Sequence, residues 1–134
     1  MGASRQFDGV NDSASTASAV NYGGSKIATF CSWVYWRAYA NDDDIILESS
    51  TNFNVNNGTF VMDPNSSGVP GKVEVDIQDG GSRYRQESIT RPTVNTWYWL
   101  AVVLDNSTVT GDVKVYVNAV EESTTIGINN KSGN

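Results

Sequence analysis

Two segments of the chain are apolar on both faces of the strands they would form, and this limits the fold more than any other feature. Residues 26–39 read KIATFCSWVYWRAY, and residues 96–104 read TWYWLAVVL. Alternate side chains of an extended strand point to opposite faces, so each segment would place large apolar groups on both. We expect residues 26–39 to lie in the middle of a sheet, covered on both sides. The expected core includes Trp33, Val34, Trp97, Leu100 and Val102, with Cys31 as a small buried side chain.

The rest of the chain predicts short strands separated by turns. Valine and isoleucine greatly outnumber leucine, and serine, threonine and asparagine are abundant, which favours strands and turns over helices. Asn57-Gly58, within residues 52–63, favours the positive φ angles of a tight hairpin turn. The 134 residues suit one all-β domain, a sandwich or barrel spanning 1–134. Its other strands are expected at residues 45–48, 72–78 (half-exposed), 83–89, 113–117 and 124–128.

Composition excludes several classes of function. The chain has no histidine, which excludes Ser-His-Asp triads and His-ligated zinc. A net charge of −6 with only nine Lys and Arg residues disfavours nucleic acid or an anionic membrane as partner. One cysteine forbids an internal disulfide, and no apolar run approaches the roughly 18 residues of a membrane-spanning segment. The start MGASRQFDGV has no apolar signal region, so export would need another route or earlier trimming.

Three blocks of sequence, in order, resemble the laminin-G-like, concanavalin A-like family. They are FDGVND at residues 7–12, TFCSWV at 29–34, and WYWLAVVLD at 97–105 leading into KVYVN at 114–118. The resemblance implies two curved antiparallel sheets in a jelly-roll sandwich. It also implies that ligands, when present, lie on the concave face or in the rim loops, and it favours an extracellular, cell-surface or virion-surface location.

The chain departs from this family at two places. The family usually has glycine after the Tyr-Val-Asn turn, where this chain has Ala119. The family also usually closes with one more strand, which would follow Ile128 and pair near Phe7. Without that strand, backbone N–H and C=O groups at the edge would lack partners, and such an edge invites other strands. We therefore expect the chain to self-associate or to work within a larger assembly.

The strongest enzymatic candidate is the segment EVDIQD at residues 74–79, which resembles the Glu-x-Asp-x-x-Glu signature of laminarinase-type β-glucanases. Retaining glycoside hydrolysis needs two carboxyl groups about 5 to 5.5 Å apart. In a regular strand Glu74 and Asp79 point to opposite faces, so this pairing would require a β-bulge between them. We expect a solvated strand face and no catalysis, with a β-glucanase as the weaker alternative.

Acidic loops are the candidates for calcium, which takes six to eight oxygen ligands. Asp42, Asp43 and Asp44 form one cluster, and Asp105 and Asp112 form another. Neither cluster has a diagnostic spacing, so calcium is a candidate cofactor and no more.

Aromatic side chains beside polar loops suggest a carbohydrate ligand, because sugar rings stack on Trp and Tyr while polar groups bind the hydroxyls. Trp36, Tyr39 and Tyr84 are the candidates, with Trp36 and Tyr39 next to the acidic loop 42–44. The sequence therefore predicts a non-catalytic binding or adhesion module for a glycan or a cell-surface glycoprotein. The alternative is a structural surface or decoration subunit of a virion or other assembly.

Overall fold

The computed structural model describes residues 13–15, 17–18, 27–38, 46–48, 57–63, 72–79, 82–105 and 112–129. These residues form nine strands and no helix, and so include no helix able to span a membrane. The strands are β1 (Ile27–Tyr35), β2 (Leu47–Glu48), β3 (Asn57–Asp63), β4 (Glu74–Asp79), β5 (Ser82–Ser88), β6 (Trp97–Asp105), β7 (Asp112–Val117), β8 (Val120–Glu121) and β9 (Thr124–Asn129).

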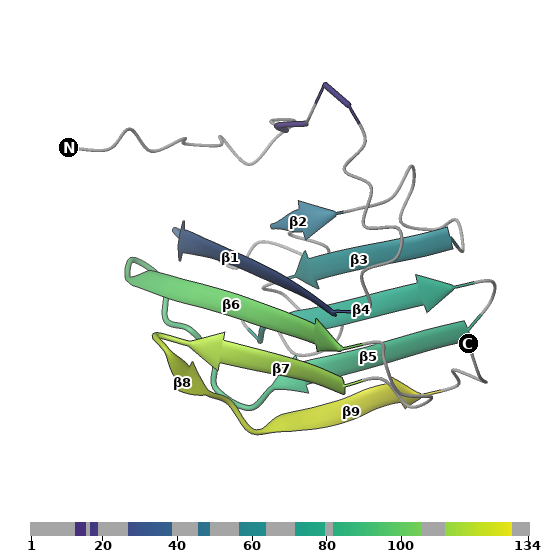
Figure 1. The fold of residues 1–134 in the computed structure, drawn as a ribbon. Coiled ribbons are helices and arrows are strands. Elements are labelled where there is room, and N and C mark those ends of the chain that lie inside the picture. The colour runs from purple at the N-terminus through teal and green to yellow at the C-terminus, as the bar shows by residue number, and fades with distance from the viewer. Residues whose placement is uncertain are drawn as a thin grey trace.

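The strands assemble into two antiparallel sheets (Figure 1). The four-stranded sheet has the order β1-β6-β7-β8, and the five-stranded sheet has the order β2-β3-β4-β5-β9. Every strand pairing is antiparallel. The predicted all-β architecture of two antiparallel sheets is confirmed.

The hydrophobic core lies between the two sheets. Val73 and Val75 are fully buried on the five-stranded side, and Leu100 and Val102 are fully buried on the four-stranded side. Burial of each such side chain contributes about 1.5–3 kcal/mol. The prediction that Leu100 and Val102 are core residues is confirmed, while Val34 is half-buried and packs against the same cluster.

The prediction that both faces of residues 26–39 are covered is wrong. In the described sheet β1 is an end strand, bonded to β6. Trp33 is 63% exposed and Trp97 is 52% exposed, so neither is a core residue, and Cys31 is exposed as well. Phe30 and Val34 point into the core instead, because alternation along β1 sends odd-numbered side chains to the other face.

The predicted hairpin turn at Asn57-Gly58 is also wrong. Both residues lie in β3, whose register against β4 shifts between Asn57 and Thr59. Gly58 is the extra residue at this irregularity, and glycine within a strand often marks a bulge. The conformational freedom of Gly58 is therefore used in a β-bulge and not in a hairpin turn.

A two-residue turn joins β7 to β8. Asn118 and Ala119, at φ 51° and 66°, lie between the paired residues Val117 and Val120, and two positive φ angles define a type I′ hairpin. The Asn118 N–H donates to the Trp99 carbonyl at 2.8 Å, and the Trp99 N–H donates to Asn118 Oδ1 at 3.0 Å. The turn forms without the family's glycine, although a left-handed residue with a Cβ costs roughly 1–2 kcal/mol.

We predict that Ala119→Gly stabilises the fold by about 0.5–1 kcal/mol, since glycine removes this steric cost but loses more entropy on folding. Urea unfolding monitored by tryptophan fluorescence measures the change. The matched control is Ala101→Gly, in the regular strand β6, where glycine should destabilise by about 0.5–1 kcal/mol or more. A loss of stability in Ala119→Gly would contradict the prediction.

Candidate functional site

Four aromatic side chains gather on the outer face of the four-stranded sheet. Across the β1–β6 pairing Tyr35 lies opposite Trp97, and Trp33 lies opposite Trp99. Trp33, Trp97 and Tyr35 are 63%, 52% and 41% exposed, and Trp99 is half-buried. We call these four residues the aromatic face. Neighbouring exposed aromatic side chains make this face a candidate interaction surface.

Contacts within the protein hold one end of the aromatic face in place. The rings of Tyr35 and Trp97 are tilted by 49° with centroids 5.3 Å apart, a favourable aromatic arrangement. The Tyr35 hydroxyl donates to Asn95 Oδ1 at 3.4 Å, and the Asn95 N–H donates to the Trp36 carbonyl at 2.7 Å. Asn95 adopts φ 60°, a conformation that asparagine tolerates well. The loop before β6 therefore supports the end of β1.

An open hollow of about 540 Å³ lies at the other end of the aromatic face. It is lined by Trp33, Trp99, Asn118 and Ala119. The hydrogen bonds between Asn118 and the Trp99 backbone attach the β7–β8 turn to β6. The β7–β8 turn thus forms one wall of the hollow, and the indole rings of Trp33 and Trp99 form another wall.

Polar side chains flank the aromatic face on β7 and β8. Tyr116, which pairs with Ala101 of β6, donates from its hydroxyl to Glu121 Oε2 at 3.1 Å. Lys114 Nζ lies 3.6 Å from Glu121 Oε1, with both side chains roughly half exposed. The outer face therefore combines ring surfaces on β1 and β6 with hydroxyl and carboxylate groups beside them. This combination suits a ligand with apolar C–H faces and hydroxyl edges.

The structure buries Trp36, the tryptophan that the sequence predicted to contact a ligand. Trp36 is only 9% exposed and belongs to the core, where its ring lies 6.2 Å from that of Tyr98. It follows the last residue of β1 and turns inward, so it offers no free ring. Four other predicted ligand residues lie outside the described residues: Tyr39, Asp42, Asp43 and Asp44. For Tyr84, the structure describes the backbone but not the side chain.

The second acidic pair predicted for calcium is brought together by the fold. Asp105 and Asp112 are register partners at one end of the β6–β7 pairing. Calcium needs more oxygen ligands than two side chains supply. Within the described ranges, no group of three or more acidic, histidine or cysteine residues is arranged to hold a metal ion. Calcium binding remains a prediction.

The segment that resembles the glucanase signature is part of an ion-pair network. Glu74 and Asp76 are buried, so the predicted solvated face of residues 72–78 is wrong. Arg85 Nη1 lies 3.5 Å from Glu74 Oε1, Arg85 Nη2 lies 3.7 Å from Glu87 Oε1, and Lys72 Nζ lies 3.6 Å from Glu87 Oε2. Four charged side chains on or next to β4 and β5 thus alternate in sign, in the order Glu74, Arg85, Glu87 and Lys72.

Strand β4 has no bulge of its own. It pairs with β5 without a register shift, and the irregularity opposite its end belongs to β3. Positions 74 and 79 therefore belong to opposite faces of the strand, as regular alternation requires. The bulge that would pair Glu74 with Asp79 is not found in β4.

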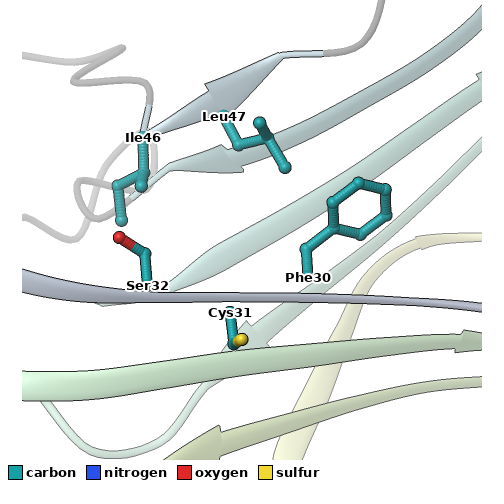
Figure 2. Close-up of a pocket in the computed structure, with 5 residues that line it drawn as sticks. All are labelled: Phe30, Cys31, Ser32, Ile46 and Leu47. Atoms are coloured by element: carbon teal, nitrogen blue, oxygen red, sulfur yellow. The ribbon is translucent and has the colours of Figure 1, made fainter. Parts of the chain in front are cut away.

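A smaller hollow of about 250 Å³ lies between β1 and β2, the neighbouring end strands of the two sheets (Figure 2). Figure 2 shows Ile46 and Leu47 pointing toward Phe30 and Ser32, while the Cys31 side chain points away to the other side of β1. The described lining residues are mostly apolar, and only Ser32 and Cys31 among them carry a hydroxyl or thiol group. Phe30, Ile46 and Leu47 also pack against the core cluster, so this part of the hollow continues the core and shows no convergence of polar groups.

The sequence contained a signal for the aromatic face that the apolar pattern alone did not reveal. Val113, Val115 and Val117 alternate with polar residues and identify the inner face of β7. Once β6 pairs with β7, the same alternation assigns Leu100 and Val102 to the core and leaves the odd-numbered tryptophans outside. The sequence alone did not show which strands pair, and this information was needed to identify the exposed face of β6.

A comparison with family models agrees with the resemblance. The model described as the concanavalin A-like lectin/glucanases superfamily matches residues 8–134. No curated protein and no solved structure gave a significant match to the chain.

We predict that Arg85→Leu destabilises the protein by about 3 kcal/mol, because the largely buried Glu74 and Glu87 would lose the countercharge they share, and Lys72 would remain as an ion-pair partner of Glu87 alone. Urea unfolding measures the loss. The matched control is Lys114→Leu, which breaks an exposed pair and should cost no more than about 1 kcal/mol. Adding Glu74→Gln and Glu87→Gln to Arg85→Leu should restore part of the stability. Equal losses in Arg85→Leu and Lys114→Leu would contradict the prediction.

Proposed function

The chain belongs to the concanavalin A-like lectin/glucanases superfamily, and we propose that it is a non-catalytic glycan-binding module whose ligand lies on the aromatic face. The observation that carries the proposal is the exposure of Trp33, Trp97 and Tyr35 on one face of one sheet. The superfamily includes both lectins and glucanases, so the choice between binding and catalysis rests on the side chains of this chain.

Stacking on the exposed rings is the physical basis of the proposed binding. Sugar rings have faces rich in C–H groups and edges rich in hydroxyls, and they match an aromatic plane flanked by polar groups. Trp33 and Trp97 supply ring surfaces, and Tyr116 and Glu121 supply the polar groups beside them. Tyr35 and Asn118 are already held by contacts within the protein, which reduces the entropy lost on binding.

The arrangement of acids favours binding over hydrolysis. Glu74 is ion-paired with Arg85, and regular alternation separates it from position 79. Retaining hydrolysis would need two closely spaced carboxyl groups facing one ligand. The aromatic face itself lies on the other sheet, away from this segment.

A structural subunit is the second candidate, and the exposure of Ile27 favours it. Ile27 is 57% exposed at the far end of β1 and extends the apolar outer face beyond the four aromatic residues. Such a surface can also pack against another copy of the chain or another subunit. In that case Trp33 and Trp97 would be contact residues of an assembly.

We predict that Trp33→Ala and Trp97→Ala each weaken polysaccharide binding at least about tenfold, which corresponds to about 1.4 kcal/mol. Affinity gel electrophoresis against a panel of soluble polysaccharides finds a ligand, and calorimetry measures its affinity. Both tryptophans are largely exposed, so the variants should keep the far-UV circular dichroism of the wild type. The matched control is Ile89→Ala, an exposed apolar side chain after β5, which should bind as the wild type does.

Two results would contradict the proposal. The first is that no polysaccharide in the panel retards the folded protein. The second is that a bound polysaccharide is held equally well after Trp33→Ala. Oligomers detected by multi-angle light scattering that dissociate in Trp33→Ala, together with no polysaccharide binding, would favour the assembly subunit.

A further inference from the structure

We infer that the ligand of the aromatic face is an uncharged polysaccharide, and that the face discriminates against sulfated and uronate-rich chains. This inference rests on the proposed function and adds the chemical class of the ligand. It is carried by the distribution of charge over the outer face of the four-stranded sheet and by the spacing of the aromatic rows.

Next to the four aromatic residues, the described outward positions of β1 and β6 carry no charged side chain, and Asp105 lies at the far end of β6, opposite Ile27. Along β1 and β6 the outward positions beside the four aromatic residues are Thr29, Cys31, Ala101 and Val103. Asn118 and Ala119 complete the hollow without adding charge. A ligand lying over the indoles would therefore meet no countercharge beneath it.

The one cation on the described strands of this face is already matched by a carboxylate. Lys114 pairs with Glu121 at 3.6 Å. Arg37, two residues beyond the end of β1, is engaged in an interaction of its own. Anionic glycans are recognised by arginine and lysine groups that bind sulfate or carboxylate through charge-assisted hydrogen bonds. Both described cations near the face therefore already interact within the protein, which weakens their attraction for an anionic ligand.

The other charged side chains described on the strands of this face are acidic. Asp105 lies at the end of β6, and Glu121 lies beside Tyr116. The chain as a whole carries a net charge of −6. A polyanion approaching this face would be repelled, whereas the carboxylate of Glu121 can accept hydrogen bonds from neutral sugar hydroxyls.

The spacing of the rings favours a polymer over a single sugar. The row formed by Tyr35 and Trp97 and the row formed by Trp33 and Trp99 are two residues apart along the strands, about 7 Å. The hollow beside the second row is open to solvent. One sugar ring cannot cover both rows at once, so consecutive residues of a chain would engage them together.

The test compares neutral and anionic polysaccharides as probes of the full chain. The neutral probes are laminarin, xyloglucan and galactomannan, and the anionic probes are heparin, alginate and polygalacturonate. We expect at least one neutral probe to bind at least about tenfold more tightly than every anionic probe. Its affinity should change less than about twofold between about 0.05 and 0.5 M salt, because salt screens charge interactions but leaves stacking in place. Trp33→Ala should weaken this binding at least about tenfold.

A variant that adds a cation tests whether charge is the cause of the discrimination. Thr29 is exposed on the outer face of β1, beyond the aromatic rows, and Thr29→Lys places a positive charge there. Heparin affinity should rise at least about threefold at low salt, and affinity for the neutral probe should not change. Thr29→Ser is the matched control and should bind both probes as the wild type does.

Failure of the inference and failure of the proposed function give different results. If heparin or alginate binds more tightly than the neutral probes, and Trp33→Ala removes that binding, the inference is overturned and the proposed function stands. No gain of heparin binding in folded Thr29→Lys would also overturn the inference. If no probe depends on Trp33 for binding, the proposed function itself is overturned.

Discussion

The pairing of β1 with β6 is the constraint on which the rest of the structure depends. It runs without interruption over nine residue pairs, from Ile27 with Asp105 to Tyr35 with Trp97. A shift of either strand by one residue would move every side chain to the opposite face. Because both strands are apolar on both faces, composition does not determine which set of side chains enters the core. The pairing of β6 with β7 decides this, since the valines of β7 must be buried.

The same pairing separates the residues that stabilise the fold from those proposed to bind. Leu100 and Val102 contribute to the core, whereas Trp33 and Trp97 leave more than half of their surface in water. Exposed indoles add little to stability and raise the hazard of aggregation. Their presence is therefore better explained by an interaction than by folding. The strained backbone of Ala119 supports the same interpretation, because Ala119 lines the hollow next to the indoles and strained residues cluster at functional sites.

The two sheets use their outer faces in different ways. On the four-stranded sheet, the outer face is aromatic and largely exposed. On the five-stranded sheet, Glu74 and Arg85 form a charged network with little exposure. Buried ion pairs add little net stability compared with apolar side chains, but the loss of one partner is costly. The network therefore penalises other registers between β4 and β5, and it occupies the acid that the glucanase resemblance pointed to.

The sequence by itself determined the fold class, most of the strands and the superfamily, because local alternation and turn residues encode them directly. Leu100 and Val102 were correctly assigned to the core, and residues 113–117 were correctly read as a strand with one apolar face. Only the tertiary structure decided that Trp36 is buried and Trp33 exposed, and that Gly58 serves a bulge. A strand that is apolar on both faces carries no internal information about which face is covered. That choice depends on the pairing partner and on the opposing sheet, which lie far apart in the sequence.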